Sequence, residues 1–136
     1  MEEIDASTGE LVAALGRLGI DDRTLVVFTS DNGGPLKQGA NNRPLRAGKG
    51  TTWEGGMRVP CLVRWPKTIP AGTVSDELMS TLDLLPTFAR LAGAEIPGDR
   101  IIDGRDVTPL LTGEAGARTP HEAFFHYHLG LSLIHI

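Results

Sequence analysis

Apolar residues follow a helical spacing near the start of the chain. The residues with this spacing between about Glu2 and Leu18 are Ile4, Leu11, Val12, Leu15 and Leu18, and they predict a helix with one apolar stripe. Ser7 with Glu10 would form a capping box that starts the helix late. Alternatively, the helix starts earlier and keeps Gly9 inside it, at a cost of about 1 kcal/mol. Gly19 is a plausible C-cap.

Two later runs are apolar and predict strands. Leu25–Phe28 turns abruptly into polar residues, and Cys61–Trp65 lies between Pro60 and Pro66, which cannot donate to a ladder. Short runs of this kind are typical of strands that are buried on both faces of a parallel sheet. Together with the N-terminal helix, they predict an α/β layer architecture.

The second half of the chain predicts helical turns separated by links rich in proline and glycine. Asp83 is predicted to cap a helix that carries an apolar stripe and ends at Gly93. Asp106–Leu111 predicts one or two helical turns stopped by Gly113, and His121–His128 predicts an extended segment.

The last six residues, LSLIHI, are apolar and end without a cap or turn. A strand-like edge of this kind is unusual at a natural terminus. We therefore expect a portion of one domain over residues 1–130 and a truncated or foreign tail over residues 131–136.

Composition narrows the function classes. The 136 residues carry a net charge of −4, which argues against nucleic-acid binding, since that requires a basic surface. No apolar run approaches the length of a membrane span, and the acidic start MEEIDASTGE is not a secretory signal. The single cysteine, Cys61, cannot form an internal disulfide.

Asp31 and Asn32 directly follow the first predicted strand, where ligands bind in open α/β sheets. A carboxylate and an amide oxygen are hard ligands that suit Ca²⁺ or Mg²⁺. The alternative is an Asp-Asn-Gly turn, in which the two side chains bond to their own backbone.

Lys49 is held between two glycines, eighteen positions after Asp31. Glycines let a ligand approach the backbone closely, so this lysine could place its charge on an anion beside the metal pair. A P-loop is excluded, because Arg43 and Gly50 occupy positions where that motif needs other residues. The alternative is a lysine in a solvated loop.

Four blocks in this order resemble one family: TSDNGG, PLRAGKGTTWEGGMRVP, STLDLLPTFARLAG and IDGRDVTPLLTG. They are similar to the sulfatases, specifically the arylsulfatase type in the alkaline phosphatase superfamily, over roughly residues 2–127. The resemblance implies an alkaline-phosphatase-like sandwich, with a mostly parallel sheet flanked by helices, of which this chain is an incomplete part.

The resemblance also implies a reaction. Family members hydrolyse sulfate esters with a formylglycine nucleophile, made from Cys or Ser within Cys/Ser-x-Pro-x-Arg, and one divalent cation, usually Ca²⁺. Asp31 and Asn32 match the family's second pair of metal ligands, and Lys49 matches the lysine that contacts the sulfate. Substrates would be small-molecule or carbohydrate sulfate esters, and family members are usually secreted, periplasmic or lysosomal.

Several parts of the family's site lie upstream in that family and are absent from this sequence: the first metal aspartates, the formylglycine motif and a set of catalytic His and Lys residues. Cys61 cannot replace the nucleophile, because the Pro and the Arg spacing are missing, and we expect it to be a small apolar residue on a buried strand. The chain is therefore expected to be the C-terminal part of a catalytic domain, with Met1 inside a helix. Alone, it should bind Ca²⁺ weakly and turn over nothing.

Two other functions stay open. One is a phosphate- or phosphonate-ester hydrolase of the same superfamily, which the upstream nucleophile and metal ligands would distinguish. The other is a non-catalytic pseudo-sulfatase that binds anions through Lys49.

His126 and His128 would share one face of a strand, where a metal pair is geometrically possible. No third ligand is evident, so surface or packing histidines are the favoured interpretation.

Other polar residues near Lys49 have several possible roles. Trp53 could line the rim of the site or pack in the core, and Glu54 with Arg58 is expected to be an internal ion pair or loop anchor. The loop Asn41, Asn42 and Arg43 could face substrate, and the sequence leaves this open.

Overall fold

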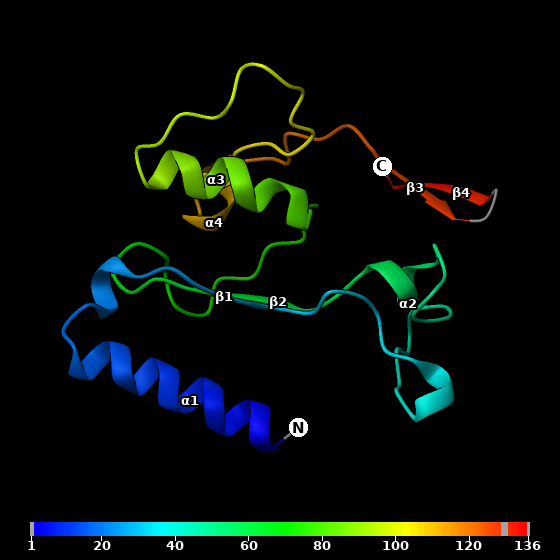
Figure 1. Cartoon of the computed structure of the whole chain (residues 1–136), viewed down its shortest axis with the longest axis horizontal. Helices are drawn as coiled ribbons and strands as arrows, with labels where there is room; N and C mark the ends of the chain where they lie inside the picture. Colours follow the sequence, from blue (N-terminus) through cyan, green and yellow to red (C-terminus); the bar gives the residue numbers. More distant parts are fainter. Residues whose placement is uncertain (1, 129–130, 136) are drawn as a thin grey trace. The chain divides into compact units, whose positions relative to one another are not determined.

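The computed structural model describes residues 2–128 and 131–135, with the side chains of residues 2–126. Its elements are, in order, α1 (Glu2–Arg17), η1 (Asp21–Arg23), β1 (Val26–Thr29), η2 (Leu36–Gln38), α2 (Glu54–Met57), β2 (Cys61–Arg64), η3 (Thr81–Asp83), α3 (Leu84–Leu91), α4 (Thr108–Leu111), β3 (Phe124–His128) and β4 (Leu131–His135) (Figure 1). β1 pairs with β2, and β3 pairs with β4.

The chain divides into two compact units, each made of two segments. The first unit consists of Met1–Val26 and Val63–Thr119, and the second consists of Val27–Leu62 and Pro120–Ile136. All predicted site residues, Asp31, Asn32 and Lys49, belong to the second unit.

The N-terminal helix is confirmed, but the capping box is wrong. The Ser7 hydroxyl donates to the Glu3 carbonyl at 2.8 Å and that of Thr8 to the Ile4 carbonyl at 2.7 Å, so both residues lie inside the helix. The earlier start therefore applies, and Gly9 is tolerated in mid-helix. Gly19 has a φ of 65°, as expected for a C-cap, because glycine adopts this left-handed conformation without steric cost. Met1 lies outside the described residues.

Both predicted strands form, but neither is buried on both faces. Phe28 on β1 is 40% exposed and Leu62 on β2 is 62% exposed. Each of these strands has a single partner among the described residues, so the pair does not gain the cover of a broad sheet. Cys61 is exposed, so the expectation of a buried cysteine is wrong as well.

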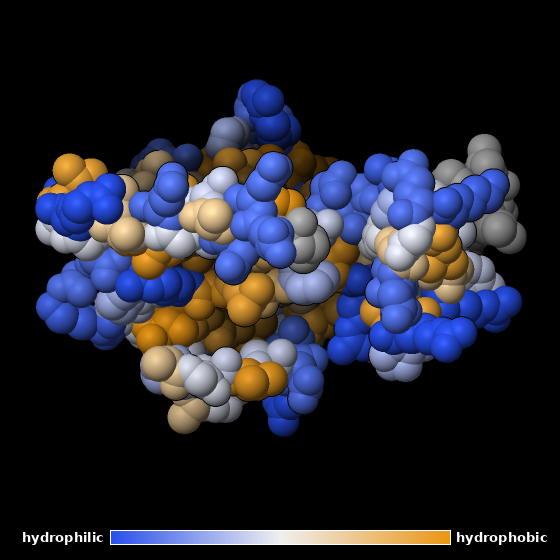
Figure 2. All heavy atoms as spheres, turned by 90° about the horizontal axis from the view of Figure 1, so that it is seen from below, coloured by the Kyte–Doolittle hydropathy of each residue, from blue (hydrophilic) through white to orange (hydrophobic). Residues whose placement is uncertain are grey.

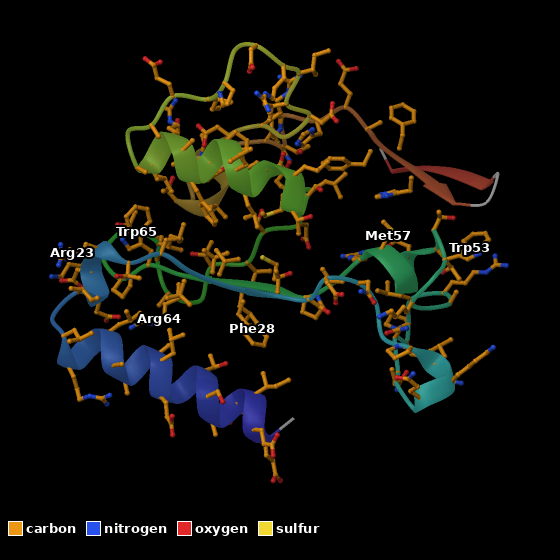
Figure 3. The ribbon with its side chains drawn as sticks, in the orientation of Figure 1. Arg23, Phe28, Trp53, Met57, Arg64 and Trp65 are labelled. Carbon is orange, nitrogen blue, oxygen red and sulfur yellow. The ribbon has the colours of Figure 1, made fainter. Side chains whose placement is uncertain are left out.

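Polar contacts fasten the end of β2 and the residue that follows it to η1, within the first unit. The Arg64 guanidinium donates to both carboxylate oxygens of Asp21, at 2.6 and 2.9 Å, and it holds the pKa of that carboxyl below its usual value. The Trp65 indole N–H donates to the Asp22 carbonyl at 2.9 Å. Figure 3 shows Arg64 and Trp65 around η1. These contacts fix the end of β2.

Asp83 occupies the N-cap position of α3, as predicted, but its side chain makes no capping hydrogen bond to that helix. Ser80 caps the preceding η3: its hydroxyl accepts from the Leu82 N–H at 3.3 Å, while the Asp83 carboxylate accepts from the Ser80 N–H at 2.8 Å. The other Asp83 oxygen accepts from the Arg105 N–H at 2.8 Å. Asp83 is therefore a fully buried anchor that ties the helix start to a segment twenty-two residues later.

The small core of the first unit lies between α3 and the start of α4. Val107 and Thr87 are fully buried, and the Thr87 hydroxyl accepts from the Val107 N–H at 3.0 Å. Arg90 reaches Asp106 with an N–O distance of 3.0 Å. The predicted helical turns are confirmed as α4, which ends before Gly113 with a φ of 70°.

The C-terminal segment forms an antiparallel hairpin. Phe124 pairs with His135 and His128 pairs with Leu131, which confirms the expected extended segment. The predicted division after residue 130 falls inside this hairpin and stays a prediction. Ile136 and the side chain of His128 lie outside the described part of the chain.

Large apolar side chains are open to solvent in both units, and Figure 2 shows apolar surface on one face. They include Leu18 at 69%, Leu62 at 62% and Phe125 at 58% exposure. Within the described ranges, no helix is long and apolar enough to cross a membrane.

The Glu77 carboxylate joins the segment before η3 to Arg118 and Thr119 at the end of the first unit, a set of contacts that we call the Glu77 clasp. Its two carboxylate oxygens accept from the Arg118 guanidinium and from the Thr119 N–H, both at 2.7 Å, and the Thr119 hydroxyl donates to the Leu78 carbonyl at 2.6 Å. The Thr119 N–H and then Arg118 hold the pKa of Glu77 below its ordinary value of 4.5.

This clasp should open in acid. A carboxyl with a depressed folded pKa contributes stability above its unfolded pKa, and the contribution is lost as the pH falls below about 4.5 through the folded value. We expect the Thr119 amide resonance to shift with a midpoint below 4.5 in an NMR titration. The E77Q variant should show no such titration, and an unchanged Thr119 shift in the wild type would contradict the clasp.

Candidate active site

Three backbone hydrogen bonds bring together the glycine-rich segments of the second unit. The Gly33 N–H donates to the Gly56 carbonyl at 2.9 Å, and the Lys49 N–H donates to the Gly34 carbonyl at 3.2 Å. The Gly55 N–H donates to the Arg46 carbonyl at 2.8 Å. The residues after Asn32 are therefore joined directly to the loop of Lys49 and to α2.

These contacts require glycine. A Cβ added to Gly33 would lie 1.7 Å from the Gly55 carbonyl oxygen, and one added to Gly48 would lie 2.5 Å from the Gly34 carbonyl oxygen. A Cβ on Gly55 would lie 2.2 Å from the Ala47 carbonyl oxygen. The obstructing atoms belong to the backbone and cannot swing aside, so any side chain at these positions would separate the segments.

Asn42 fastens the same segments with its side chain. Its Oδ1 accepts from the Gly34 N–H at 3.0 Å, and its Nδ2 donates to the carbonyls of Gly34 and Ala47 at 2.9 and 3.0 Å. A side-chain amide carries the same donor and acceptor types as a peptide group, so it can pair with backbone groups as another backbone segment would. The sequence left open whether this loop faces substrate, and the structure gives the Asn42 side chain a structural role in joining these segments.

The two predicted metal ligands do not form the alternative turn. Asp31 is exposed and Asn32 is half-buried, and neither side chain bonds to the backbone among the described residues. The Ser30 hydroxyl makes the local turn contact instead, donating to the Asn32 carbonyl at 2.9 Å. The carboxylate of Asp31 and the amide oxygen of Asn32 are left available to a ligand.

Lys49 and Asn32 line one open cavity of about 440 Å³. The other lining residues are Gly50, Thr51, Thr52, Gly56, Met57, Phe125 and His126. The Lys49 side chain is exposed, while its backbone is held by Gly34. Asp31 does not line the cavity but directly precedes Asn32. The structure thus brings two of the three predicted residues together around one hollow.

The residues present fit part of a hard-cation site. Asp31 and Asn32 supply oxygen ligands suited to Ca²⁺ or Mg²⁺, which take six or more such ligands. Across the described ranges, no group of three or more His, Cys, Asp or Glu residues could hold a metal. Asp31 and Asn32 can therefore supply two ligands of a cation site. The remaining ligands of a complete coordination shell must come from elsewhere.

No residue of this chain fits the formylglycine. Cys61 is followed by Leu62, Val63 and Arg64, without the proline of the required motif. Desolvation raises the pKa of the Cys61 thiol, and a hydrogen bond with Thr29 lowers it by less. The thiol is thus kept protonated, unlike an activated nucleophile.

The remaining candidates have structural contacts. The Arg46 guanidinium lies 3.7 Å from the centre of the Trp53 ring, and Trp53 is 38% exposed and hence not a core residue. Glu54 and Arg58 form the expected ion pair at 3.4 Å. His126 is half-buried and lines the cavity, a position that the sequence did not indicate.

Comparisons with known proteins agree with this arrangement. Residues 1–94 match the family model described as Sulfatase. The chain is 52% identical over 135 residues to steryl-sulfatase from Mus musculus, covering 93% of this chain and 22% of that protein. It is 48% identical over 128 residues to arylsulfatase A from Homo sapiens, covering 92% of this chain and 24% of that protein.

Solved structures show the same likeness. The crystal structure of Ps i-CgsB in complex with k-i-k-neocarrahexaose superposes with a TM-score of 0.85 at 45% identity, covering 96% of this chain and 29% of that one. This chain therefore shares the α/β fold of the sulfatase structures. It belongs to the sulfatase family, and it spans 22% and 24% of the two curated relatives described above.

Removing the Asn42 amide should loosen the site. The N42A variant loses three hydrogen bonds and leaves partly buried backbone groups unpaired, at a cost of about 2 kcal/mol. We expect amide hydrogen exchange at Gly34 and Lys49 to accelerate by a factor on the order of ten or more. The matched control is N41A, since Asn41 only accepts from the nearby Arg43 N–H. Equal acceleration in both variants would contradict this structural role of the Asn42 side chain.

Proposed function

We propose that this chain supplies the metal- and sulfate-binding part of an enzyme that hydrolyses sulfate esters. The observation that carries the proposal is that Lys49 and Asn32, on loops seventeen residues apart, line one cavity beside the exposed Asp31. Membership of the sulfatase family supports the same reaction. The curated relatives are named for sulfatase activity on steryl, aryl and N-acetylgalactosamine esters.

Each residue has a distinct role in this proposal. Asp31 and Asn32 hold one divalent cation, Ca²⁺ or Mg²⁺, through their side-chain oxygens. Lys49 places its ammonium group on the sulfate, where charge accumulates as the ester bond breaks. The cation, when bound, stabilises the same charge. Because the glycine contacts fix both loops before substrate arrives, little reorganisation is needed during the reaction.

The nucleophile is proposed to be a formylglycine supplied by a part of the protein outside this sequence. In the same proposal, residues 1–130 are the C-terminal portion of a catalytic domain with a mostly parallel sheet flanked by helices. The exposed faces of β1 and β2 are then the faces that this sheet and its helices cover.

Substitution of the site residues should separate the two binding events. We expect D31N to weaken Ca²⁺ binding at least tenfold, since a charged ligand is lost. We expect K49Q to weaken binding of inorganic sulfate while Ca²⁺ binding persists. Isothermal titration calorimetry measures both, and K37Q is the matched control, because Lys37 is an exposed lysine on η2. Sulfate binding that is unaffected by K49Q would contradict the assignment.

Sequencing the coding DNA upstream of the codon for Met1 would test the enzyme class. An in-frame Cys/Ser-x-Pro-x-Arg after an Asp-Asp pair is the expected result, and it would define a formylglycine sulfatase. A different nucleophile with additional metal ligands would define a phosphate- or phosphonate-ester hydrolase. A stop codon directly before Met1 would favour a non-catalytic anion-binding protein.

A further inference from the structure

The loop that carries Lys49 is closed by two contacts at its base. The Gly55 N–H donates to the Arg46 carbonyl at 2.8 Å, which closes the backbone loop of residues 46–55. Just inside this bond, the Arg46 guanidinium carbon lies 3.7 Å from the centre of the Trp53 ring, in van der Waals contact with it. Figure 3 shows Trp53 beside α2, the helix that begins at the next residue. Lys49 lies between the two stacked residues in the sequence, so the stack spans the loop that carries the lysine.

Within this loop, Ala47 has a strained backbone. Its φ is 63°, in the left-handed region that a residue with a Cβ adopts only at a steric cost. Ala47 directly follows Arg46 and lies two residues before Lys49. A residue keeps such a conformation only when its surroundings hold it there. The contacts beside Ala47 are the stack of Arg46 on Trp53 and the hydrogen bond from Asn42 Nδ2 to the Ala47 carbonyl at 3.0 Å.

The stack holds Arg46 without neutralising its charge. Arg46 takes part in no ion pair among the residues that the structure describes, and the sequence has no Asp or Glu between Asp31 and Glu54. A carboxylate partner would also fix the guanidinium, but it would cancel a positive charge three residues from Lys49. An aromatic face attracts a cation through its quadrupole and leaves the net charge in place. The loop is therefore anchored and keeps the positive charges of both Arg46 and Lys49.

We propose that Arg46 and Trp53 are positioning residues for Lys49, because their stack holds the loop in the strained conformation that keeps the lysine at its cavity. We call this pair the Arg46–Trp53 latch. The inference rests on the proposed function, since the latch acts on sulfate through Lys49. Neither Arg46 nor Trp53 lines the cavity of Lys49, so neither contacts the substrate. When the latch is removed, Ala47 relaxes to a negative φ and the lysine leaves its place at the cavity.

Isothermal titration calorimetry of inorganic sulfate against the full chain, in the presence of Ca²⁺, tests the latch. We expect R46Q and W53L each to weaken sulfate binding about fivefold, the factor that corresponds to ~1 kcal/mol for an exposed cation–π contact. The combined variant should bind no more weakly than R46Q, since both substitutions remove the same contact. W53F keeps an aromatic face and should stay within about twofold of the wild type. Losses that multiply in the combined variant would overturn the latch.

Two further variants separate positioning from charge. R43Q is the matched control, because Arg43 is an exposed arginine three residues from Arg46, and it should leave the sulfate affinity unchanged. A47G relieves the strain, because glycine adopts the left-handed conformation freely, and it should restore most of the affinity that W53L loses. In the wild type, A47G should change the affinity by less than about twofold. Equal losses in R43Q and R46Q, or no restoration of W53L by A47G, would overturn the proposal.

Amide hydrogen exchange without sulfate tests the latch apart from the proposed function. We expect exchange of the Gly55 N–H to accelerate about fivefold in W53L and to stay unchanged in R43Q. Faster exchange with an unchanged sulfate affinity would leave a purely structural stack and overturn the positioning role. Absence of sulfate binding in the wild type overturns the proposed role of Lys49, whereas unchanged exchange in W53L overturns the latch itself.

Discussion

The close approach of glycine backbones in the second unit is the constraint on which the candidate site depends. Gly33 approaches Gly55 and Gly48 approaches Gly34 so closely that a single methyl group would collide with carbonyl oxygens. The Asn42 amide then ties Gly34 to Ala47. Asp31, Asn32 and Lys49 are flanked by these contacts, so their backbones are fixed although the side chains of Asp31 and Lys49 are exposed.

The two units use polar anchors in place of a large core. In the first unit, Asp83, Glu77 and Asp21 each join segments that lie more than twenty residues apart in the sequence. Among the described residues, only Val107 is a buried hydrophobic residue. Hydrogen bonds to charged groups are stronger than neutral ones, and they specify geometry as well as stability. The first unit is therefore held together by a few directional contacts.

Local features were predictable from the sequence, whereas long-range contacts were not. The helical spacing located α1 and α3, and the glycines at positions 19 and 113 marked where α1 and α4 end. The position of Asp83 at the start of α3 was predicted, but its role as a buried anchor was missed, because its partner Arg105 lies far along the chain. The role of Asn42 was missed for the same reason, although the crowding of glycines around it was a visible signal. Phe125 and His126 joined the cavity only through the tertiary fold.

The three hydrogen bonds of the Asn42 side chain make the site sensitive to a change of one atom. Its Nδ2 faces two carbonyl oxygens, those of Gly34 and Ala47. Spontaneous hydrolysis of the amide would put a negatively charged oxygen in the place of that nitrogen, with the shape of the side chain preserved. The two attractive contacts with the Gly34 and Ala47 carbonyls would become repulsive, and the loop that carries Lys49 would no longer be held against Gly34. Chemical ageing at a residue that never touches substrate would then limit the working lifetime of the site.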